Sequence, residues 1–418
     1  MSSTLPLVEE TKFLIPIVTI LGISVLLTVI IQKLKLNFIP TFVIEIIVGI
    51  VLKQLFYDSS YKIEYNGVVE VMYSMGLIFI MFLSGYDNNL LIIKHDRLNQ
   101  NNQIDIRKMT IVFLILIYIF SFISSLLLYK FYINKLIGIL LLTIVFASTF
   151  AGIVVPMLKD NTLIKSQIKK FIIYFSTISE LISIVALSFI MTISEFKIIN
   201  VFGMVMLLLL LIVVWLFNKF LTQSSKKLEE GYTYIYLRII IIFLGLSVIF
   251  SEFIGGEYIL GSFILGMFLK KINVYKKEVE KLESFSYGIF TPIFFVLVGT
   301  KLDVKIFEQN PKWLFVVLLL SVLLIICKIP LIYFAKKYDK KTISYMMSLI
   351  SCTLIVGVAV EHFGIENQIF SEDFGECIIF SSIITCIVSS VVSEKITIKM
   401  LKRNNDKNYM EEREFNSI

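Results

Sequence analysis

Long hydrophobic stretches separated by short polar segments recur along the whole chain. A helix needs roughly 20 apolar residues to cross the ~30 Å hydrocarbon core of a bilayer, and thirteen stretches approach that length. The pattern therefore predicts an all-α polytopic membrane protein with about thirteen transmembrane helices. These are expected at residues 13–32, 38–55, 67–84, 109–129, 135–158, 167–194, 198–221, 235–252, 257–271, 284–300, 312–334, 342–361 and 375–396.

Six predicted spans precede the seventh and six follow it. This arrangement suggests two inverted six-helix repeats, at residues 13–194 and 235–396, joined by a linking helix at 198–221. Residues 1–396 then form one transmembrane domain, and 397–418 form a short cytoplasmic tail. In this alignment the fifth span corresponds to the twelfth.

Small polar residues interrupt both of these corresponding spans. The interruptions are expected at Ser148 and Gly152 in the fifth span and at Ser351, Thr353 and Gly357 in the twelfth. Paired interruptions of this kind are typical of discontinuous helices whose ends form the binding site of a transporter. The alternative is a small-residue face that packs against neighbouring helices, which is also common in membranes.

One acidic residue, Glu180, lies in the middle of the sixth span. A carboxylate at that depth costs roughly 2.5–3.5 kcal/mol on insertion scales, so it is expected to pair, to bind a cation or to carry a proton. Ser176, Ser179 and Ser183 share its helix face because they recur at three- and four-residue spacing. The pattern favours a transient site for a monovalent cation or a proton over a purely structural hydrogen bond.

Lys328 is the second charge expected inside a span, the eleventh. An ion pair between Lys328 and Glu180 would lower the cost of burying both charges, and a competing cation could break it. The alternative is a lysine that extends to the membrane interface, since Lys336 and Lys337 follow closely.

Composition agrees with a membrane protein. Hydrophobic residues make up 57% of the 418 residues and charged residues 17%, whereas a soluble domain has about 25% charged residues. The net charge of +7 comes from loop lysines, which indicates topology and not binding of nucleic acid. Predicted loops on one side carry 27 of the 39 Lys and Arg, and those on the other carry 9. The positive-inside rule then places the N-terminus outside and the C-terminus in the cytoplasm.

No cofactor is expected. The four cysteines lack the spacing of a metal site, and the two histidines form no cluster. The chain also has no HExxH or Gly-x-Ser-x-Gly motif, so an intramembrane enzyme is disfavoured.

Four segments together resemble the monovalent cation–proton antiporters, in the branch that includes the Kef-type potassium and NapA-type sodium exchangers. Their order and spacing cover essentially the whole chain. The segments are Asn37–Leu52 (NFIPTFVIEIIVGIVL), Met75–Gly85 (MGLIFIMFLSG), Gly255–Gly266 (GGEYILGSFILG) and Thr291–Thr300 (TPIFFVLVGT).

The resemblance implies a sodium/hydrogen exchanger fold in a bacterial cell membrane. It further implies a homodimer, whose core domain moves like an elevator against a dimerisation domain and exchanges a monovalent cation for protons. The acidic pair of the family falls on Ser179-Glu180, its crossing-helix threonine on Thr149 and its lysine on Lys328. This chain departs from the family because Ser179 cannot titrate and Glu180 replaces an aspartate.

Two further functions remain open at this stage. A membrane sensor could keep the antiporter fold without transport, and a channel-like protein could release potassium independently of protons. The sequence does not distinguish sodium from potassium, since the number of oxygen ligands and the size of the cavity decide ion selectivity.

Overall fold

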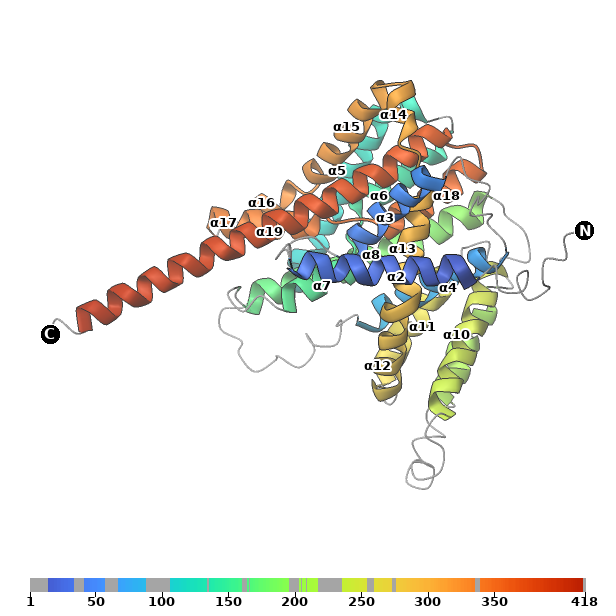
Figure 1. Cartoon of the computed structure of the whole chain (residues 1–418), viewed down its shortest axis with the longest axis horizontal. Coiled ribbons are helices and arrows are strands. Elements are labelled where there is room, and N and C mark those ends of the chain that lie inside the picture. Colours follow the sequence, from blue (N-terminus) through green and yellow to red (C-terminus); the bar gives the residue numbers. More distant parts are fainter. Residues whose placement is uncertain are drawn as a thin grey trace, which may run out of the picture. The chain divides into compact units, whose positions relative to one another are not determined.

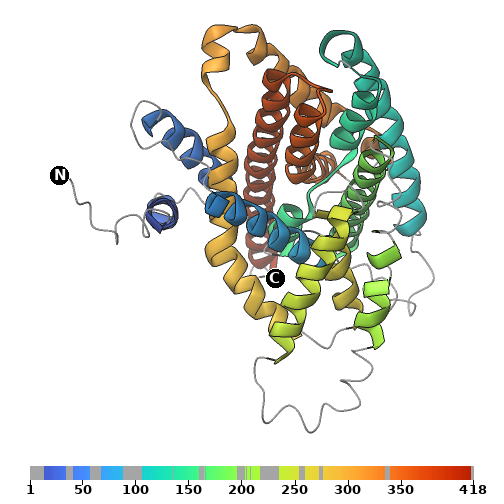
Figure 2. The same ribbon diagram turned by 90° about the vertical axis from the view of Figure 1, so that its right-hand side faces the viewer.

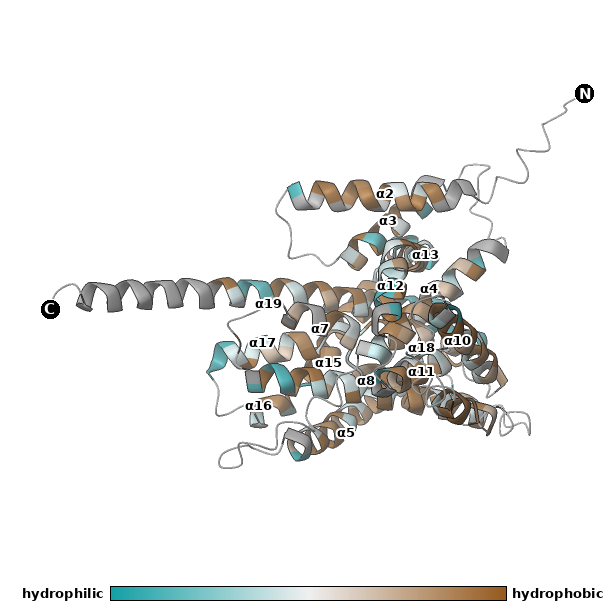
Figure 3. Ribbon diagram, turned by 90° about the horizontal axis from the view of Figure 1, so that it is seen from below, coloured by the Kyte–Doolittle hydropathy of each residue, from teal (hydrophilic) through white to brown (hydrophobic). Residues whose placement is uncertain are grey.

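The computed structural model describes residues 14–33, 41–56, 67–87, 106–133, 135–159, 164, 166–194, 203, 205–207, 209–216, 235–253, 259–272, 276–334 and 339–415. All regular elements within these ranges are helices, which confirms the predicted all-α class. Six of the helical segments are long and apolar enough to cross a membrane. Helices α2 (Leu14–Lys33), α5 (Ile106–Tyr132) and α10 (Ile235–Phe253) are hydrophobic along most of their length (Figure 3).

The helices divide into two compact units, residues 1–88 with 184–308 and residues 89–183 with 309–418. Each predicted repeat contributes helices to both units. Besides α2 and α10, unit 1 contains α3 (Thr41–Phe56), α4 (Gly67–Asp87), α11 (Ile259–Ile272), α12 (Lys276–Phe285), the π-helical turn η2 (Ser286–Phe290) and α13 (Thr291–Lys301). Besides α5, unit 2 contains α6 (Ile137–Ala147), α7 (Ala151–Lys159), most of α8 (Ser166–Ser194), α15 (Lys312–Ile326), α16 (Pro330–Phe334), α17 (Lys340–Ile350), α18 (Ile355–Glu366) and α19 (Glu372–Phe415). The short helix α14 (Lys305–Gln309) lies at the junction in the sequence.

Pairs of glycines hold the helices of unit 1 close together. A Cβ atom on Gly49 of α3 would overlap the backbone oxygen of Val296 in α13, and a Cβ on Gly299 of α13 would overlap that of Ile46 in α3. Gly85 and Gly266 stand in the same reciprocal relation between α4 and α11. Only glycine allows two helix backbones to approach this closely.

Unit 2 contains the two interrupted helices that the sequence predicts. Helix α6 ends at Ala147 and α7 begins at Ala151; α17 ends at Ile350 and α18 begins at Ile355. These two interrupted spans are the most buried of the six, at 83% and 78%, against 39–61% for the others. Helix α19 packs against α15, α17 and α18 and so supports the second interrupted helix (Figures 1 and 2).

The structure differs from the prediction at three helices. The eleventh span divides into α15 and α16 because Pro330 lacks an N–H group and its ring disrupts the preceding turn, so Lys328 lies in the turn between them. The tenth span begins earlier, at Lys276, and passes through the π-helical turn η2 just before Pro292. Helix α19 continues to Phe415, so most of the predicted 397–418 tail is helical.

Some predicted features lie outside the described residues. The linking helix is described only at 203, 205–207 and 209–216, and the N-terminal parts of the segments that begin at Asn37 and Gly255 are not described. The predicted membrane orientation of the termini is not tested by the helices themselves.

We expect Gly299→Ala to destabilise unit 1, because the added methyl group forces α3 and α13 apart. Overpacking of this kind costs about 1–3 kcal/mol. Thermal unfolding in detergent, followed by size-exclusion chromatography, should show a lower midpoint for this variant. Gly245→Ala in α10 is the matched control, since a Cβ there meets nothing within 4 Å. An unchanged midpoint for Gly299→Ala would contradict the role of the glycine pair.

Candidate functional site

The two helix interruptions are joined directly by hydrogen bonds. The Thr149 hydroxyl donates to the carbonyl oxygen of Ile350 at 2.7 Å, at the end of α17. The backbone N–H of Phe150 donates to the carbonyl oxygen of Cys352 at 2.8 Å. The hydroxyls of Ser148 and Thr353 lie 2.6 Å apart. Each interruption thus supplies partners for backbone groups that the other leaves without a helical partner.

Glu180, on α8, contacts the start of α7, the second half of the first interrupted helix. The N–H of Ala151, the first residue of α7, donates to its Oε2 atom at 3.1 Å, and only 1% of the residue is exposed. The N-terminus of a helix carries a partial positive charge, so this position stabilises a carboxylate.

Lys328 lies at the opposite end of the same interruption. Its Nζ atom donates to the carbonyl oxygens of Ala147 at 2.8 Å and Ser148 at 2.9 Å, where α6 ends. The C-terminus of a helix carries a partial negative charge and favours a cation. Glu180 and Lys328, the buried charges among the described residues of unit 2, therefore occupy the two helix ends whose partial charges are opposite to their own.

Ser179 connects these two groups. Its hydroxyl donates to the Ala147 carbonyl oxygen at 2.9 Å, the same oxygen that accepts from Lys328. The described hydrogen bonds of Lys328 go to backbone carbonyls, and its predicted ion pair with Glu180 stays a prediction. The structure instead brings both residues to one interruption through backbone groups.

The two glycines assigned to the interruptions lie just beyond them, in the first turns of α7 and α18. A Cβ on Gly152 would lie 2.7 Å from the ring of Phe150, and a Cβ on Gly357 would lie 2.9 Å from the hydroxyl oxygen of Ser382. Their role in the structure is to leave room for neighbouring side chains, whereas Ser148, Ser351 and Thr353 lie in the non-helical segments.

Sequence reasoning missed several contributors to the site. The N–H of Ala151 and the carbonyl of Ala147 are backbone groups, so no residue type indicates them. Tyr118 of α5 is a third contributor, since its hydroxyl lies 3.1 Å from that of Ser183 on the α8 face that carries Glu180. A tyrosine within an apolar span was the one sequence signal for this contact.

The site offers oxygen ligands and one carboxylate. Carboxylate, hydroxyl and carbonyl oxygens are the ligands that hard cations prefer. The described residues 351–357 of the second interruption contain no charged side chain. Among the described residues at the two interruptions, Glu180 therefore supplies the carboxylate.

Comparison with known proteins agrees with this architecture. A family model described as "Sodium/hydrogen exchanger, transmembrane" matches residues 20–399. Over 387 residues the chain is 27% identical to a Bacillus subtilis (strain 168) protein named "Putative Na(+)/H(+) antiporter YjbQ". The matched region covers 91% of this chain but only 62% of that protein.

A solved structure supports the fold. The sodium proton antiporter MjNhaP1 from Methanocaldococcus jannaschii superposes with a TM-score of 0.61 at 16% identity. The match covers 94% of this chain and 99% of that one, so the two folds agree over nearly their full length.

We expect Lys328→Met to destabilise unit 2, because the Ala147 and Ser148 carbonyls lose a cationic donor. Hydrogen bonds to charged groups contribute about 1.5–3 kcal/mol each. The thermal unfolding midpoint in detergent should fall more than for Ser179→Ala, which removes one neutral hydrogen bond. Lys312→Gln is the control, since Lys312 is exposed at the start of α15. Equal midpoints for Lys328→Met and the control would rule out this role.

Proposed function

Because this chain belongs to the sodium/hydrogen exchanger family, we propose that it exchanges a monovalent cation, sodium or potassium, for protons across a membrane. Glu180 is the shared binding site for both ions in this proposal. The observation that carries it is the buried carboxylate of Glu180, which accepts the N–H at the start of α7, inside the interruption. Since the chain spans less than two-thirds of its curated relative, the activity of the whole protein belongs to the proposal as well.

Coupling follows from competition for one carboxylate. A bound proton neutralises Glu180 and removes its attraction for a cation, while a bound cation excludes the proton. A carboxylate without either ion is costly to bury away from water. The loaded states are therefore the ones that cross between the two faces of the membrane, and the two ions move in opposite directions.

Cation ligands beyond Glu180 would come from the neighbouring oxygens. Ser179 and Thr149 carry hydroxyls that donate to helix-end carbonyls, so their oxygen lone pairs remain available to a cation. Lys328 contributes in another way, by holding the end of α6 in place without a ligand oxygen of its own.

Movement of unit 2 as one body against unit 1 would carry the site across the membrane like an elevator. All the hydrogen bonds of the site described above lie within unit 2, so such a movement would preserve them. Unit 1 would form the interface of a homodimer. In the membrane, the N-terminus would lie outside and the C-terminus in the cytoplasm. The tight glycine packing of unit 1 suits a static scaffold.

Glu180→Gln should abolish the exchange. Proteoliposomes containing a pH-sensitive dye would be given an inward or outward gradient of sodium, potassium or lithium, and the resulting pH change measured. The glutamine amide keeps the size of the side chain, but it can neither bind a proton nor neutralise the charge of a bound cation. Glu394→Gln on α19 is a matched carboxylate control and should leave transport unchanged.

Transport by Glu180→Gln at the wild-type rate would refute the assignment of this residue. Absence of cation-coupled proton flux in the folded wild-type protein would favour the membrane sensor. That alternative is supported by Ser179, which cannot titrate. Cation flux that does not depend on protons would favour the channel-like protein.

The exchange should be electroneutral, one cation for one proton, because Ser179 cannot supply a second proton. Imposing a membrane potential with a gradient of a permeant anion such as thiocyanate, in potassium-free buffer, during sodium-driven exchange should then leave the rate unchanged. A rate that follows the potential would mean that a second group titrates, and Lys328→Gln would show whether Lys328 is that group.

A further inference from the structure

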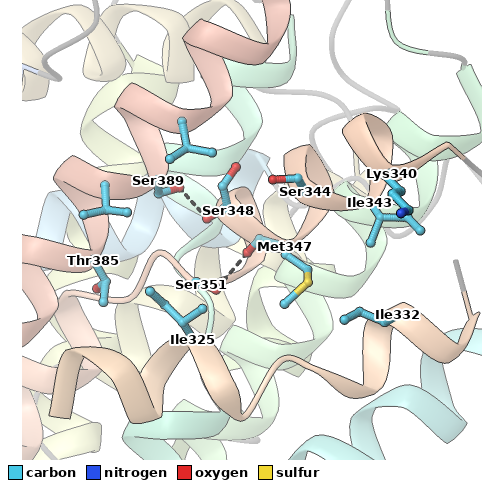
Figure 4. A pocket seen from close by; sticks show the side chains of 12 residues that line it. Ile325, Ile332, Lys340, Ile343, Ser344, Met347, Ser348, Ser351, Thr385 and Ser389 are labelled. Atoms are coloured by element: carbon cyan, nitrogen blue, oxygen red, sulfur yellow. Dashed lines mark hydrogen bonds between the residues drawn. The ribbon is translucent and has the colours of Figure 1, made fainter. Parts of the chain in front are cut away.

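Unit 2 has a cavity of about 370 Å³ that Glu180 does not line; its lining residues come from α15, α16, α17 and α19 and from Ser351 at the end of α17. This volume lies within the roughly 300–1,000 Å³ typical of sites for small ligands. Figure 4 shows Lys340 at one end of this groove and Ile325 and Thr385 toward the other.

The walls of the groove are apolar in effect. Six aliphatic or thioether side chains line it, namely Ile325, Ile332, Ile343, Met347, Val388 and Val392. Four of its hydroxyls donate to backbone carbonyls: Ser348 to Tyr345, Ser351 to Met347, Thr385 to Ser382 and Ser389 to Ser348. These donors are satisfied within the protein, so the groove suits a hydrocarbon chain better than a hydrated ion.

The mouth of the groove is cationic and lies at headgroup level. Lys340 begins one membrane-spanning segment, and Tyr333 ends the preceding one, so both lie at the same edge of the bilayer. Lys340 lines the groove and Lys341 follows it, against one acidic neighbour, Asp339, so the described residues at this end carry a net positive charge. Basic sites between transmembrane helices at this level bind anionic lipid headgroups.

The depth of the groove matches one leaflet. From Lys340 to Ser351, α17 and its cap rise about 16 Å at 1.5 Å per residue. This is roughly half of the ~30 Å hydrocarbon core. A chain that enters at the headgroups therefore ends near the bilayer centre, beside Ser351 at the second helix interruption.

We propose that this groove binds an anionic phospholipid, with an acyl chain between α15, α17 and α19 and the phosphate at Lys340. The bound chain would fill the space behind α17 and support the end of the helix whose Ile350 carbonyl accepts from Thr149. An effect of this lipid on ion exchange rests on the proposed function, whereas lipid binding itself does not.

The test is lipid retention by the full chain in detergent, measured by native mass spectrometry. Purified protein would be titrated with dioleoyl phosphatidylglycerol or with dioleoyl phosphatidylcholine. We expect the phosphatidylglycerol adduct to be favoured at least threefold. Lys340→Gln should remove that preference, and Lys341→Gln should keep it, because Lys341 is also exposed but does not line the groove.

Filling the groove is the second arm of the test. Ser344→Phe on α17 and Val388→Trp on α19 act from two different helices, so misfolding of one variant does not decide the result. Both should lose the tight lipid adduct while eluting as the wild type does on size-exclusion chromatography.

Three outcomes would overturn the proposal. Equal losses in Lys340→Gln and Lys341→Gln would mean unspecific surface charge, and equal binding of both lipids by the wild type would exclude recognition of the anionic headgroup. Retention of the adduct in both groove-filled variants would place the lipid elsewhere. Because these readouts need no ion flux, failure of the antiporter assignment would leave them unaffected.

Discussion

The structure of unit 2 depends on one constraint, that a helix interrupted inside a membrane must find partners for its free backbone ends. No water is available in the hydrocarbon core, so each unpaired N–H or carbonyl costs several kcal/mol. Here Lys328 and Ser179 donate hydrogen bonds to a carbonyl oxygen at the end of α6, and Thr149 donates to one at the end of α17. Glu180 accepts a hydrogen bond from the N–H at the start of α7. The charged and hydroxyl side chains of unit 2 thus also stabilise its two helix interruptions.

The two units answer different physical demands. Unit 1 is held by glycines at which helix backbones touch, as at Gly49 and Gly299, and such contacts resist displacement. Unit 2 places buried polar and charged groups at helix ends, where they form hydrogen bonds with backbone atoms. The four segments that resemble the antiporters all lie in unit 1, whereas Thr149, Glu180 and Lys328 lie in unit 2. The four segments that carry the resemblance thus belong to helices of unit 1, including the closely packed pairs α3–α13 and α4–α11.

A single acid beside a serine is an economical form of such a site. Ser179 still serves the Ala147 carbonyl, so the neighbouring position keeps a structural role without adding a titrating group. The charges of Glu180 and Lys328 each face a helix end of opposite partial charge. Helix-end effects fall off within one turn, so these interactions act only near the interruption.

The hydrophobic pattern by itself determined the all-α membrane class, most span boundaries to within a few residues and the buried position of Glu180. These features follow from local composition, since apolar length and small polar residues act within one helix. Small polar residues indicated two interruptions but left a helix-packing face as the alternative, and the structure decided for the interruptions. Only the tertiary structure decided which backbone groups meet Glu180 and Lys328, because Ala147 and Ala151 carry no signal in their side chains. It also revealed the Pro330 turn that presents Lys328 and the groove between α15, α17 and α19. Residues far apart in the sequence form both the contact between the two interruptions and the groove. Packing between several segments brings these residues together, and no single segment encodes it.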